Sequence, residues 1–159
     1  MTSRRVTLLA ASLVLVLSAS AARAGAAGEA DTAVLVEAIR ANRKALVAVN
    51  LDLTDEEAKK FWPAYDHYQE QMSAVQDRLV KVIEDYIANF DKLTDEKAMQ
   101  IVKDYLAVEA DGVKVKQENL AAFSAALPGK KVARFYQIEN KMDAVVRYKL
   151  AETIPVVAQ

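Results

Sequence analysis

Residues 54–90 read TDEEAKKFWPAYDHYQEQMSAVQDRLVKVIEDYIANF, and this stretch decides the fold class. Its apolar residues recur at alternating intervals of four and three, which is the spacing of one face of an α-helix. The repeat lasts for more than three heptads, so the helix should pack lengthwise against a neighbour, as in bundles and coiled coils. The members of this aromatic stripe are Phe61, Tyr65, Tyr68, Met72, Val75, Leu79, Val82 and Tyr86.

Both this helix and the next begin with a capping signal. Thr54 is followed three residues later by Glu57, which predicts a capping box in which each side chain bonds the other residue's backbone N–H. Thr94 precedes a second acidic first turn and predicts another N-cap. The sequence therefore predicts helix starts at about residues 55 and 95.

The remaining apolar patterns complete an all-α fold. A shorter helix is expected from about residue 32, and Pro128–Gly129 is a turn signal that should precede a last helix from about residue 130. We predict four helices, with a long helical hairpin and heptad-like packing, arranged as a bundle or a bent cradle. Pro63 should bend the second helix, and Gly112 should mark a close helix crossing or a short break in the third.

The N-terminus has the pattern of a cleavable signal peptide. Arg4 and Arg5 precede an uncharged run from Val6 to Leu17, followed by the triplet Ala22-Arg23-Ala24. The alternative is a membrane anchor, but spanning a bilayer needs about 20 apolar residues. The expectation is a signal peptide over 1–24, a single helical domain over 25–159, periplasmic localisation, and no stable membrane insertion after cleavage.

Composition argues against several classes of partner. The chain has 21 basic and 22 acidic residues, and loss of residues 1–24 removes three arginines and no acid, so 18 bases and a net charge of −4 remain. Nucleic-acid binding needs clustered positive charge, so nucleic acid is not an expected partner. Without cysteine no disulfide can form, and stability must come from packing.

The two caps carry a family resemblance. Leu-Thr-Asp-Glu occurs at 53–56 and again at 93–96, and in an exported helical chain this layout resembles the Spy/CpxP family of periplasmic LTxxQ-motif proteins. Glu57 and Lys97 stand where the motif has Gln. The resemblance implies a helical-hairpin protomer, paired into a cradle-shaped homodimer, that shields unfolded periplasmic proteins without ATP or dampens an envelope-stress sensor. Some relatives are linked to metal resistance.

Two readings remain for the aromatic residues near Pro63. Aromatic side chains at helical spacing usually form core, but Phe61, Trp62, Tyr65 and Tyr68 are also the candidate client-binding residues. A second candidate surface is basic and concentrated in the last helix. Its residues are Lys59, Lys60, Lys130, Lys131, Arg134, Lys141, Arg147 and Lys149, and the alternative is an ordinary mixed surface.

Other chemistry finds little support in the sequence. His67 is the single histidine, and with nearby acids it is the candidate metal ligand, although a dedicated site usually needs several nitrogen or sulfur ligands. No nucleophile-elbow sequence is present, so neither an enzyme nor a cofactor is expected.

The sequence thus favours a periplasmic binding protein that is chaperone-like or acts in envelope stress, with unfolded or partner proteins as ligands. The alternatives are a metal-responsive accessory protein and an interaction protein with one dedicated partner. A homodimer and a compact four-helix protomer both remain open as the assembly.

Overall fold

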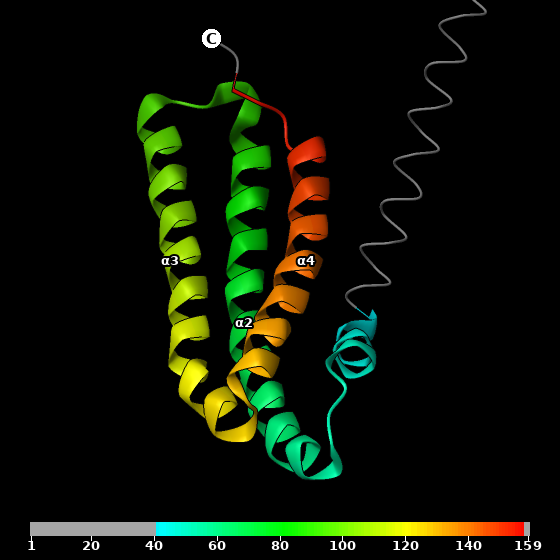
Figure 1. Cartoon of the computed structure of the whole chain (residues 1–159). Coiled ribbons are helices and arrows are strands. Elements are labelled where there is room, and N and C mark those ends of the chain that lie inside the picture. The colour runs from blue at the N-terminus through cyan, green and yellow to red at the C-terminus, as the bar shows by residue number, and fades with distance from the viewer. Residues whose placement is uncertain (1–40, 158–159) are drawn as a thin grey trace, which may run out of the picture. The chain divides into compact units, whose positions relative to one another are not determined.

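The computed structural model describes residues 41–157, and these are helical apart from short connections (Figure 1). Residues 41–51 form a helix, followed by α2 (Asp55–Asn89), a 3-10 turn η1 (Phe90–Lys92), α3 (Asp95–Ala126) and α4 (Gly129–Thr153). The all-α prediction is confirmed, and so are the predicted helix starts near 55, 95 and 130. The predicted signal peptide and the start of the helix expected near residue 32 lie outside the described residues.

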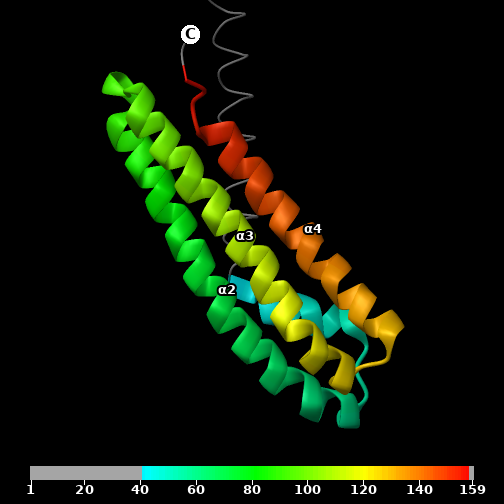
Figure 2. The same ribbon diagram turned by 90° about the vertical axis from the view of Figure 1, so that its left-hand side faces the viewer.

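The chain divides into two units between Arg43 and Lys44, and the second unit contains α2, α3 and α4. Helix α2 runs antiparallel to α3 across η1, and α4 turns back beside them after Pro128 (Figures 1 and 2). None of the helices in the described part of the chain is long and apolar enough to cross a membrane.

Both predicted caps are present. The Thr54 hydroxyl accepts from the Glu57 backbone N–H at 3.3 Å, and the Glu57 carboxylate accepts from the Thr54 N–H at 2.8 Å, which completes the capping box. The Thr94 hydroxyl accepts from the Lys97 N–H at 3.2 Å. These bonds satisfy N–H groups that the first helical turn leaves without partners.

Neither helix-breaking residue interrupts its helix. Helix α2 continues through Pro63, and α3 continues through Gly112. A Cβ atom built on Gly112 would lie 3.7 Å from Val75 Cγ1, an ordinary van der Waals distance. Gly112 therefore marks no break in α3, and that alternative is wrong, whereas its position against Val75 places it where α3 faces α2.

An aromatic core fills one end of the three-helix unit, near the start of α2 and the turn between α3 and α4. Phe123 of α3 and Phe135 of α4 lie 4.5 Å apart between ring centroids, and Phe61 contacts both. Edge-to-face and tilted arrangements of this kind are the favoured geometries of aromatic pairs. The fully buried rings are Phe61, Tyr65, Tyr68, Phe123 and Phe135.

The turn before α2 is fastened to α4 by basic side chains. Lys131 Nζ donates to Asp52 O at 2.7 Å and to Glu57 Oε2 at 2.5 Å, and Arg134 Nε donates to Asn50 O at 2.6 Å. Asp52 has a φ of 50°, which is uncommon outside glycine. Two members of the predicted basic surface thus make specific contacts within the chain.

Candidate functional site

The aromatic stripe changes its environment along α2. Its first four residues, from Phe61 to Met72, are buried, whereas Val75, Leu79, Val82 and Tyr86 are only half-buried. The spacing of the backbones explains the change. The backbones of α2 and α3 approach each other closely, but that of α4 stays farther from both. Five buried aromatic rings fill this wider gap at one end, whereas the side chains at the other end leave it open.

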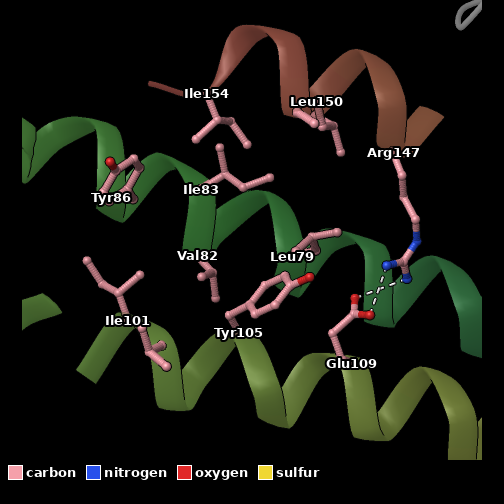
Figure 3. A pocket seen from close by; sticks show the side chains of 12 residues that line it. Leu79, Val82, Ile83, Tyr86, Ile101, Tyr105, Glu109, Arg147, Leu150 and Ile154 are labelled. Carbon is pink, nitrogen blue, oxygen red and sulfur yellow. Dashed lines mark hydrogen bonds and ion pairs between the residues drawn. The ribbon is translucent and has the colours of Figure 1, made fainter. Parts of the chain in front are cut away.

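The open part is an apolar groove of about 470 Å³ between α2, α3 and α4. Its size falls in the range of small-molecule sites. Figure 3 shows Leu150 of α4 and Ile154, the residue after α4, above Ile83 and Leu79 of α2, with Ile101 and Tyr105 of α3 on the facing wall. The lining residues are Leu79, Val82, Ile83, Tyr86, Ile101, Val102, Tyr105, Glu109, Arg147, Leu150, Ala151 and Ile154.

Polar groups close the two ends of the groove. At the end nearer the aromatic core, Arg147 donates two hydrogen bonds to the Glu109 carboxylate, at 2.8 and 3.0 Å (Figure 3). At the other end, the Tyr86 hydroxyl donates to Pro155 O at 2.7 Å. A bidentate pair of this type has a fixed geometry, and its hydrogen bond to Glu109 raises the pKa of Arg147 above its ordinary value.

The four predicted client-binding residues differ in how far they are exposed to solvent. Phe61, Tyr65 and Tyr68 are at most 1% exposed and form core, so in this conformation they present no surface to a client. Trp62 is half-buried, packs edge-on against Phe61, and carries Lys44 Nζ 5.3 Å above its ring. Of the four, only Trp62 remains a candidate contact residue on the surface.

The predicted metal ligand His67 lies on the surface, whereas Glu139 is a buried charged residue. His67 is exposed on α2, and among residues 41–157 no three potential ligands of the His, Cys, Asp and Glu types gather into one cluster. Glu139 is buried at 1% exposure on α4 and accepts a hydrogen bond from Gln69 Nε2 at 3.3 Å. Burial, together with the Glu139 charge, raises the pKa of Tyr136. The Tyr136 hydroxyl donates to Lys116 O at 2.7 Å.

Sequence reasoning missed the groove because it treated the whole stripe as one surface. Leu79, Val82 and Tyr86 belong to that stripe, but their partial exposure depends on how far α4 stands from α2.

The chain matches no protein-family model, no curated protein and no solved structure.

Proposed function

We propose that this chain is an exported, non-enzymatic binding protein of the periplasm, whose groove takes up apolar segments of unfolded or partner proteins without ATP. The apolar groove between α2, α3 and α4 is the observation that carries the proposal. Export rests on the sequence pattern of residues 1–24. More specifically, we propose that the protein acts as a general chaperone or in the envelope-stress response.

A polypeptide suits the groove better than a compact polar ligand for two reasons. The walls are aliphatic and aromatic, and Val102 and Tyr105 remain 47% and 41% exposed, so an apolar chain would remove this surface from water. The Arg147 guanidinium and the Tyr105 hydroxyl lie at the rim of this apolar surface. Such groups can donate to the backbone carbonyls of an extended segment without requiring a particular side chain.

The direct test is suppression of aggregation of a reduced, unfolding client by the purified protein and by the variant Ala151→Glu. Ala151 lines the groove and is exposed, so a glutamate there places a charge against the apolar walls. Both residues favour helix, so α4 should persist. We expect the parent protein to suppress aggregation at or below equimolar ratio and Ala151→Glu to lose most of this activity.

Ala144→Glu is the matched control. Ala144 lies on the same helix, seven residues earlier, is also exposed, and does not line the groove. It should behave as the parent does. Equal loss in both variants, or no suppression by the parent at equimolar ratio, would remove the groove proposal.

Two further arms separate the alternatives inferred from the sequence. Trp62→Ala tests client contact at the one partly exposed residue of the predicted set, and should leave suppression intact if the groove is the docking site. The same assay with zinc tests the metal-responsive alternative, which requires a gain that depends on His67. Binding of a single partner with no effect on an unrelated client would instead favour the dedicated-partner alternative.

A further inference from the structure

The chain continues past the end of α4 as a short apolar tail, residues 154–157, with the sequence Ile-Pro-Val-Val. Helix α4 ends at Thr153, and Pro155 cannot extend it, because proline lacks a backbone N–H and disfavours the helical conformation in the residue before it. Ile154 accordingly has a φ of −85° and a ψ of 118°, which is extended backbone. The tail therefore leaves α4 and crosses to α2, where it meets Tyr86 (Figure 1).

A side-chain contact and a hydrogen bond hold the tail against the groove. The half-buried side chain of Ile154 lines the groove and points toward α2 (Figure 3). The Tyr86 hydroxyl donates to Pro155 O at 2.7 Å. The two valines that follow are 88% and 52% exposed. A segment with so little buried surface opens at low free energy, so the tail can leave the groove while the helices stay folded.

The tail presents to the groove the same groups that an extended apolar segment of another protein presents. These are a β-branched aliphatic side chain and, one residue later, a backbone carbonyl. An incoming aliphatic side chain can take the place of Ile154, and an incoming carbonyl can take the place of Pro155 O. A tyrosine hydroxyl has a single hydrogen to donate. The tail and an incoming segment therefore exclude each other at Tyr86.

We propose that the tail is an intramolecular competitor, which covers one end of the groove and is displaced by the apolar segment that binds there. This inference rests on the proposed function and adds its regulation. Because the tail is tethered to α4, its effective concentration at the groove is high. It therefore raises the apparent Kd of every ligand that must displace it, in proportion to the fraction of molecules in which it is bound.

A tail that served as a fixed wall of the groove would have the opposite effect. Ile154 would then add apolar contact area to a bound ligand, and its removal would weaken binding. A competitor instead hinders binding, so its removal strengthens binding. The direction of the change on removal of the tail distinguishes the two roles.

The first experiment measures the binding of the apolar dye N-phenylnaphthylamine, whose fluorescence rises in apolar surroundings. The full chain is compared with a chain that stops after Thr153. We expect the shortened chain to bind about tenfold more tightly, which corresponds to a tail that is bound in about nine of ten molecules. Adding Ala151→Glu to the shortened chain should abolish this binding, because Ala151 lines the groove. That loss assigns the dye to the groove and excludes the exposed apolar residues of α3.

Tyr86→Phe tests the same contact in a chain of full length. It keeps the hydrogen bond from the Ile154 N–H to Leu150 O at the end of α4, which the shortened chain loses. Without the hydroxyl the tail is held less firmly, so the dye should bind more tightly than to the parent, by a smaller factor than in the shortened chain. Tyr148→Phe is the matched control, since Tyr148 is 63% exposed and does not line the groove. It should bind the dye as the parent does.

The second experiment observes the tail itself. Because the chain contains no cysteine, Val156→Cys provides a single site for a nitroxide spin label, on a residue that is 88% exposed. Saturating dye should make this label more mobile in its electron paramagnetic resonance spectrum. The same label at Ala144→Cys, on the exposed side of α4, should not change.

Equal, weaker or absent dye binding by the shortened chain overturns the proposal. So does a label at Val156→Cys whose mobility stays constant while the dye fills the groove. Neither result bears on client binding, which the aggregation assay with Ala151→Glu decides. Tighter dye binding by the shortened chain, combined with no suppression of aggregation by either chain, would support the tail as a competitor and overturn the proposed function.

Discussion

Thr54 and Glu57 form a reciprocal capping box at the start of α2. Each satisfies a backbone N–H of the other, and Lys131 of α4 adds a hydrogen bond to the Glu57 carboxylate. The same carboxylate thus caps α2 and fastens α4. The capping box, which is local in sequence, thus also contributes to the contact between α2 and α4.

Replacement of Thr54 by alanine should lower the free energy of unfolding by about 1 kcal/mol, the usual loss for an N-cap hydroxyl. Chemical denaturation monitored by circular dichroism measures this. Thr94→Ala provides the comparison, because Thr94 caps α3 with Lys97 in the third position and lacks the reciprocal carboxylate. An unchanged midpoint for Thr54→Ala would show that the capping box does not stabilise the fold.

Glu57 should also make stability depend on pH. The hydrogen bond from Lys131, followed by the one from the Thr54 backbone, lowers the pKa of Glu57 below its ordinary value of 4.5. A carboxylate with a lowered pKa in the folded state stabilises the fold fully above its unfolded pKa. That contribution is lost as the pH falls through the folded value. The denaturation midpoint should therefore decrease as the pH falls below about 4.5.

The variant Glu57→Gln keeps a hydrogen-bonding side chain but has no charge to titrate. It should be less stable than the parent at neutral pH, and the difference should shrink on acidification. Glu56→Gln is the neighbouring control, because Glu56 lies in the same helical turn with its side chain 77% exposed. A constant difference between Glu57→Gln and the parent across the acid range would contradict the assignment.

At the scale of the elements, local signals predicted the helices well. Caps and the Pro128–Gly129 turn depend on residues close in sequence, so the starts of α2, α3 and α4 could be predicted. The candidate site could not, because it depends on the distance of α4 from α2 and on pairs such as Glu109 with Arg147, which lie 38 residues apart.

Gly112 provides a test of how closely α2 and α3 approach. Helix α3 passes through it without interruption, and an added Cβ atom would meet Val75 Cγ1 at 3.7 Å, an ordinary contact. Gly112→Ala should therefore raise the free energy of unfolding by roughly 0.5–1 kcal/mol, because alanine loses less backbone entropy in a helix. Denaturation in urea measures the change. Destabilisation would show that the helices lie too close for a methyl group.

At the scale of the whole three-helix unit, packing is uneven from end to end. One end has five fully buried rings, whereas at the other the apolar side chains surround a groove and stay partly exposed. Apolar contacts of the core type make up most of the stability of a helix in a protein, so unequal packing should give unequal local stability. The groove end is therefore expected to open at lower free energy than the aromatic end.

Native-state hydrogen exchange should show this difference within single helices. In α2, amides of residues 79–86 should exchange faster than those of residues 65–72, and in α4 those of residues 146–150 should exchange faster than those of residues 135–142. Both comparisons use segments that lie at least three residues from the ends of their helices, which limits the contribution of fraying. An apolar peptide added at saturating concentration should slow exchange in the two groove segments and leave the aromatic segments unchanged. Equal protection along α2, or slowing that is centred on the aromatic end, would mean that the groove is neither the less stable part of the unit nor the place where apolar chains bind.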